Sequence, residues 1–67
     1  MLKYSISIQY EKNDNIFVAR VPELRGCMAH GDTPEEATKE IQIAMELWLE
    51  VAEEHGIEIP APMVYAS

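Results

Sequence analysis

This sequence lacks most of the devices that stabilise short chains. It has 67 residues and one cysteine, Cys27, so no disulfide can form within the chain. Cys27, His30 and His55 do not have the spacing of a zinc site, so we expect no bound metal and no cofactor. A domain this small buries only roughly 60% of its unfolded surface. A partner subunit is therefore the expected source of additional stability.

Long apolar runs are also missing. None approaches the roughly 20 residues that a membrane helix needs. Lys3 is followed by alternating residues and not by the apolar segment of a signal peptide. A single free cysteine fits a reducing compartment. We therefore expect a cytoplasmic protein without a membrane partner.

Basic residues are scarce. The formal net charge is −7, from five Lys and Arg against twelve Asp and Glu. The charges in residues 1–32 cancel, whereas residues 33–67 hold eight glutamates and only Lys39. An acidic surface repels phosphate backbones and attracts basic partners, so we expect no direct nucleic-acid binding. The simpler alternative is that the charge serves solubility alone.

The pattern that is present begins with strands. Residues 2–11 alternate between apolar and polar side chains, which predicts a half-buried strand. The turn-forming residues 13–15 follow, and the β-formers of residues 16–21 predict an antiparallel second strand. Pro22 ends it because proline cannot donate to a ladder, and residues 27–31 predict a short third strand. The apolar face of the first strand holds Leu2, Tyr4, Ile6, Ile8 and Tyr10.

A helix is predicted from residue 34 to residue 55. Thr33 suits the N-cap, Pro34 suits the first helical position, and Glu36 completes a capping box. Gly56 is the expected C-terminal stop. Apolar residues recur at helical spacing on one face, opposite a mainly acidic face. The apolar face holds Ala37, Ile41, Ala44, Met45, Trp48 and Ala52.

These elements predict an α+β domain of two layers, in which one amphipathic helix covers a three-stranded antiparallel sheet. Residues 63–65 are a possible short C-terminal strand. Ile43, Leu47 and Leu49 flank the core-facing side of the helix and are too apolar for full exposure. We expect these three residues and an edge strand to contact another subunit, in a dimer or a tetramer.

No residue pattern indicates catalysis. His30 at the end of the third strand and His55 in the last helical turn are interpreted as structural residues. Cys27 is interpreted as a small buried apolar residue in preference to an activated thiol. Glu35 and Glu36 are neighbours on a helix, so their side chains point about 100° apart and do not converge on one ion. We therefore expect no catalytic residue.

The order of motifs from Phe17 to Leu49 resembles the HicB-like antitoxin family. The shared pieces are Pro22-Glu23-Leu24, Gly26-Cys27, Gly31-Asp32-Thr33, Glu35-Glu36-Ala37 and, at the end of the helix, Trp48-Leu49. Each piece alone is weak, but their order and spacing are specific and span almost the whole chain. Most of the pattern has a structural explanation in strand ends, tight turns and a helix cap. The motif is therefore mainly a signature of the fold.

The resemblance implies a partial ribonuclease-H-like fold without the nuclease carboxylates. It also implies an antitoxin that binds a small basic toxin of the HicA-like kind, which cleaves messenger RNA, and covers its active site. Many members carry a C-terminal DNA-binding domain. This sequence shows no such segment, so we expect residues 1–67 to form a single antitoxin domain.

The residues expected to steer a basic partner are Glu46, Glu50 and Glu53 on the acidic helix face. Two alternatives stay open. One is an orphan homo-oligomer with a structural or regulatory role and no toxin. The other is a degenerate nuclease, which is disfavoured because the strands lack clustered carboxylates for metal ions.

Overall fold

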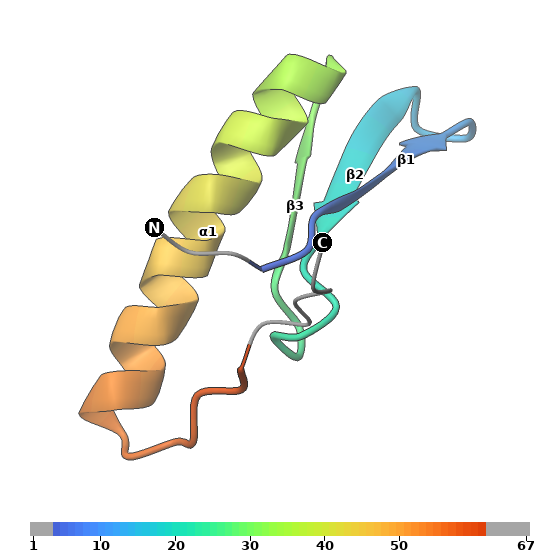
Figure 1. The fold of residues 1–67 in the computed structure, drawn as a ribbon. Helices are drawn as coiled ribbons and strands as arrows, with labels where there is room; N and C mark the ends of the chain where they lie inside the picture. Colours follow the sequence, from blue (N-terminus) through green and yellow to red (C-terminus); the bar gives the residue numbers. More distant parts are fainter. Residues whose placement is uncertain (1–3, 62–67) are drawn as a thin grey trace, which may run out of the picture.

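The computed structural model describes residues 4–61, which form a sheet covered by a helix (Figure 1). The strands are β1 (Ser7–Glu11), β2 (Ile16–Arg20) and β3 (Met28–Gly31), and the helix is α1 (Pro34–Glu54). The sheet is antiparallel with the order β1-β2-β3, and α1 packs on one of its faces. This arrangement confirms the predicted two-layer α+β fold. The possible strand at residues 63–65 lies outside the described residues.

β1 is shorter than its sequence pattern predicts. The alternation runs through residues 2–11, but the strand begins at Ser7, which pairs with the last residue of β2. β2 ends there because Pro22 follows closely and cannot donate a ladder hydrogen bond. Upstream, the backbone N–H of Ser5 donates to the Glu23 carboxylate, at 3.0 Å from Oε2. The length of the partner strand therefore sets the start of β1.

The β1–β2 hairpin turns through the polar cluster that the sequence marks. Asn15 adopts a left-handed backbone conformation with φ of 59°, and its N–H donates to the carbonyl of Glu11 at 2.7 Å. Asparagine tolerates this conformation better than most residues. The register of the hairpin pairs Ile8 with Ala19, so their side chains lie on the same face of the sheet.

The loop between β2 and β3 is held together by its own backbone. The Val21 N–H donates to the Cys27 carbonyl at 3.1 Å. The Leu24 N–H donates to the Val21 carbonyl, and the Cys27 N–H to the Leu24 carbonyl, each at 3.0 Å. All three side chains are buried. Gly26 has a φ of 78°, a left-handed conformation that favours glycine. This part of the family motif therefore builds the core.

α1 begins and ends close to the predicted residues. Thr33 Oγ1 accepts a hydrogen bond from the Glu36 N–H at 3.0 Å. Glu36 Oε1 in turn accepts from the Asp32 N–H at 3.0 Å, one residue further upstream than in the usual capping box. Beyond the other end of the helix, Gly56 has a φ of 67°. These contacts confirm the predicted N-cap and the glycine stop.

The core lies between α1 and the β2–β3 half of the sheet. Half-buried side chains, among them Trp48 and Leu49, pack around its edge. The buried residues of the core cluster are Ala19, Val21, Leu24, Cys27, Ala37, Ile41 and Met45.

Within residues 4–61, no helix has both the length and the apolar character that crossing a membrane requires.

The apolar side of β1 is left uncovered. α1 packs chiefly against β3 and β2 and only slightly against β1 (Figure 1). Ile6, Ile8 and Tyr10 are consequently exposed, whereas Tyr4 is half-buried. The prediction of a half-buried face is wrong for those three residues, because α1 makes only slight contact with the first strand.

Candidate protein-binding surface

Side chains capable of catalysis or metal binding do not converge in residues 4–61. No group of three or more His, Cys, Asp and Glu residues there is arranged to hold a metal ion. His30 lies exposed on β3, and His55 lies exposed directly after α1. The two imidazoles are on separate elements, and neither has the enclosed position in which active sites hold a general base.

Cys27 is a core residue. Its thiol is free and only 5% of the residue is exposed. Burial raises the pKa of the Cys27 thiol above its ordinary value, because desolvation disfavours the thiolate. A reactive cysteine requires a lowered pKa and access to solvent. The structure therefore agrees with the interpretation of Cys27 as a small buried apolar residue.

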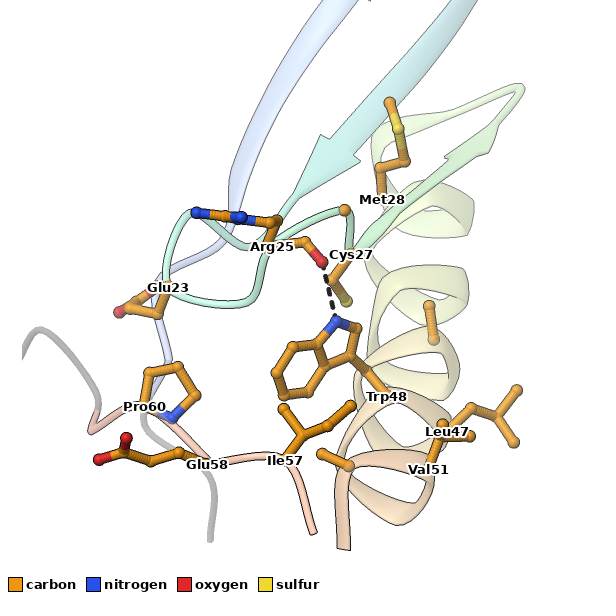
Figure 2. Close-up of a pocket in the computed structure, with 13 residues that line it drawn as sticks. Glu23, Arg25, Cys27, Met28, Leu47, Trp48, Val51, Ile57, Glu58 and Pro60 are labelled. Atoms are coloured by element: carbon orange, nitrogen blue, oxygen red, sulfur yellow. Dashed lines mark hydrogen bonds between the residues drawn. The ribbon is translucent and has the colours of Figure 1, made fainter. Parts of the chain in front are cut away.

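A groove of about 830 Å³ lies between the β2–β3 loop, the C-terminal half of α1 and the segment that follows α1 (Figure 2). Trp48 projects into it from α1, and its indole N–H donates to the carbonyl of Arg25 at 2.9 Å. This bond ties the loop to the helix. Other lining residues are Glu23, Cys27, Met28, Leu47, Val51, Ile57 and Glu58.

The side of α1 next to β3 carries an exposed apolar row. Ile43, Leu47 and Val51 follow one another at four-residue intervals, so they lie in line along the helix. They are 48%, 56% and 46% exposed. Ile43 and Leu47 share a hollow with Met28 and His30 of β3, and the groove begins at Leu47 and Val51. Ile43, Leu47 and Val51 are called the apolar row below.

The predicted oligomer-interface residues lie on two sides of α1. Ile43 and Leu47 belong to the apolar row, whereas Leu49 is half-buried and packs against the core. Their role in a subunit contact stays a prediction. Sequence reasoning missed Val51, which its four-residue spacing from Leu47 could have indicated. It also missed Met28, which joins this surface only because β3 folds beside α1.

The glutamates predicted to attract a partner lie close together. Glu46, Glu50 and Glu53 are exposed on α1 and line one shallow hollow. The apolar residues Tyr4, Leu49 and Ile59 line the same hollow. The segment after α1 is fixed there by the Tyr4 hydroxyl, which donates to the carbonyl of Pro60 at 2.6 Å. The solvent side of α1 is therefore acidic, with the exposed apolar row on one flank and the half-buried Tyr4 and Leu49 on the other.

Comparison with known proteins gives a consistent picture. Residues 4–66 match the family described as the HicB_like antitoxin of bacterial toxin–antitoxin systems. A UPF0150 protein of Synechocystis sp. is 42% identical over 60 residues, which cover 90% of this chain and 81% of that protein. A UPF0150 protein of Thermoplasma acidophilum is 34% identical over 59 residues, covering 88% and 84% respectively. One of Helicobacter pylori is 43% identical over 44 residues, covering 66% and 61%.

No solved structure matches the chain significantly, so the expected likeness to ribonuclease H stays a prediction. The family match extends from the half-buried Tyr4 beyond the last described residue, and it includes the β2–β3 loop and the helix cap. It is thus a match of the whole fold and not of one motif. The chain therefore belongs to the HicB-like antitoxins of bacterial toxin–antitoxin systems.

Proposed function

We propose that this chain neutralises a small basic toxin of the HicA-like kind, one that cleaves messenger RNA, by direct protein–protein contact. The proposed role needs no chemical step from this chain. The observation that carries it is the solvent side of α1, where Glu46, Glu50 and Glu53 lie together and the exposed apolar row runs along one flank. Such a surface suits a protein partner of opposite charge.

The charge of the chain supports a basic partner. α1 carries seven glutamates and only Lys39, so the potential around it is negative along its length. Complementary charge raises association rates by steering the approach of the partner. The same potential opposes a direct contact with RNA, so the antitoxin is expected to act on the toxin and not on the transcript.

Co-expression tests the proposal. This chain, carrying a tag, is expressed together with the product of the gene next to its own. We expect the neighbour alone to arrest growth, the pair to grow normally, and both proteins to copurify in a fixed ratio. A harmless neighbour that is not captured would contradict the antitoxin role of this chain.

A homo-oligomeric structural or regulatory role without a toxin is the second candidate. The observation in its favour is that Ile8 and Tyr10 of β1 and the preceding Ile6 are exposed, and that β1 is an edge strand in the described part of the chain. Apolar groups and free strand edges at a surface favour association. Sedimentation of the purified chain at micromolar concentration tests it. A dimer or tetramer is expected, and a stable monomer would exclude this role.

A further inference from the structure

We propose that the partner of this chain docks on the β3 side of the molecule, with the apolar row at the centre of the contact. The partner is a basic protein whose own apolar patch is bordered by Lys or Arg side chains. This inference rests on the function proposed above and adds the surface through which that function would operate. Glu50 then borders the contact, while Glu46 and Glu53, further round α1, add to the negative potential that steers its formation.

The apolar row is the first observation. Ile43, Leu47 and Val51 are each about half exposed, and they lie in line on a helix. The row continues into the groove walled by Trp48, and at its other end into the hollow beside β3. Burying such side chains against a partner removes apolar surface from water, which is the main favourable contribution to most protein association.

The charged residues around the apolar row indicate which kind of partner binds there. Glu40, Glu50 and Glu54 each lie three residues from a member of the row, on the surface neighbouring it. Lys39 also lies near Ile43, but it is the only cation on α1. Two copies that joined their rows would bring these carboxylates together, and like charges at a contact are destabilising. A basic partner would instead neutralise them.

The edge of β3 supplies polar groups beside the row. In an antiparallel sheet, pairs of opposite residues alternate between hydrogen-bonded and non-hydrogen-bonded pairs. Val21 and Cys27 form a hydrogen-bonded pair, because the Val21 N–H donates to the Cys27 carbonyl. Counting along β3 from Cys27, Met28 and His30 belong to non-hydrogen-bonded pairs. Their backbone N–H and C=O groups therefore point away from β2. In the described part of the chain β3 is an edge strand, so these groups face outwards. An apolar centre with hydrogen-bonding groups at its border is the usual composition of a protein interface.

The test uses the purified full chain and the purified product of the gene next to its own. Leu47→Ser removes the centre of the row, Leu47→Arg adds a charge that a basic partner repels, and Leu47→Met preserves the apolar contact. Gln42→Ser is the control, because Gln42 is also exposed on α1 but lies outside the apolar row and outside the exposed apolar side of β1. Urea unfolding of each variant checks that the fold is retained, as expected for a side chain that is 56% exposed.

We expect Leu47→Ser to weaken binding at least about tenfold, Leu47→Arg to weaken it further, and Leu47→Met and Gln42→Ser to stay within about threefold of the parent. If the partner binds the parent chain, but the Leu47 variants bind equally well, the docking surface is wrong and the antitoxin function survives. If the partner does not bind the parent chain, both proposals fail.

Sedimentation of the chain alone tests whether a second copy of this chain binds the apolar row instead. We expect the oligomeric state of Leu47→Ser to equal that of the parent chain, because the row is free until the partner binds. If Leu47→Ser dissociates an oligomer that Gln42→Ser leaves intact, the row is a contact between copies of this chain. That result would overturn the proposal of a basic partner at this surface.

Discussion

Gly31 lies where β3 turns into α1, and the backbone there passes too close for a side chain. A Cβ on Gly31 would lie 2.6 Å from the backbone nitrogen of Ala37 and 2.9 Å from the carbonyl carbon of Glu36. Both atoms belong to the first turns of α1 and cannot rotate aside. The glycine of the family motif is therefore required by the close approach of β3 to the helix.

We expect Gly31→Ala to lower the free energy of unfolding by about 1–3 kcal/mol, the usual cost of forcing an extra methyl group into a tight contact. Urea unfolding measures it. Gln42→Ala, at an exposed helical position, is the control and should change stability by less than about 0.5 kcal/mol. An unchanged unfolding midpoint for Gly31→Ala would mean that the turn relaxes without loss.

Cys27 gives a second prediction at this scale. Burial raises the pKa of its thiol, so at a given alkaline pH the native protein holds less thiolate than the unfolded chain. We expect iodoacetamide to alkylate native Cys27 more slowly than Cys27 in urea, and the rate to rise at higher pH. Because the folded state has the higher pKa, the thiol's contribution to stability is complete below the unfolded pKa and declines as the pH rises above it. Equal alkylation profiles in the two states would contradict its burial.

At the scale of elements, the helix depends on local contacts that the sequence displays. The Thr33 hydroxyl accepts the Glu36 N–H at 3.0 Å and satisfies one of the backbone donors at the start of α1. We expect Thr33→Ala to cost about 1 kcal/mol of stability and Thr33→Asp to cost much less, since Asp is also a good N-cap. Thermal unfolding followed by circular dichroism measures both. An unchanged stability of Thr33→Ala would mean that the cap contributes nothing.

The same elements show what could be predicted from the sequence. The cap of α1 and the turn at Asn15 are local, so residue identity alone indicates them. The start of β1 depends on where β2 ends, and the exposure of Ile8 depends on where α1 lies across the sheet. Neither follows from a periodic pattern, because the pattern shows which residues share a face and not which element covers it.

The candidate protein-binding surface could also be predicted only in part from the sequence. The surplus of apolar residues on α1 predicts that some of them are exposed, and Ile43 and Leu47 are. Leu49 shares their chemistry, yet it packs against the core because it lies on the other flank of the helix. The groove could not be predicted, because it needs the β2–β3 loop and the segment after α1 beside Trp48. Only the folded chain brings these parts together.

At the scale of the whole molecule, the distribution of charge predicts how a partner approaches. Neutralising Glu46, Glu50 and Glu53 together to glutamine should slow association with a basic partner several-fold at low salt, with a smaller effect at high salt because salt screens exposed charges. Stopped-flow measurement over a salt series checks it. An unchanged association rate would remove these residues from the recognition step.

The control for that experiment has the same change in net charge at another place. Glu11→Gln, Asp14→Asn and Asp32→Asn remove three carboxylates at or near the β1–β2 and β3–α1 turns. If net charge alone governs the approach of the partner, both triple variants slow association equally. If the acidic side of α1 steers it, only the helix variant does.

We propose that this chain inhibits a ribonuclease toxin by binding it. The most direct measurement is the cleavage of a defined messenger RNA by the purified product of the gene next to its own, with increasing amounts of this chain added. We expect cleavage to fall in proportion to the added chain and to stop at a fixed stoichiometric ratio, whatever the RNA concentration. Cleavage that continues undiminished at a molar excess of the chain would contradict it.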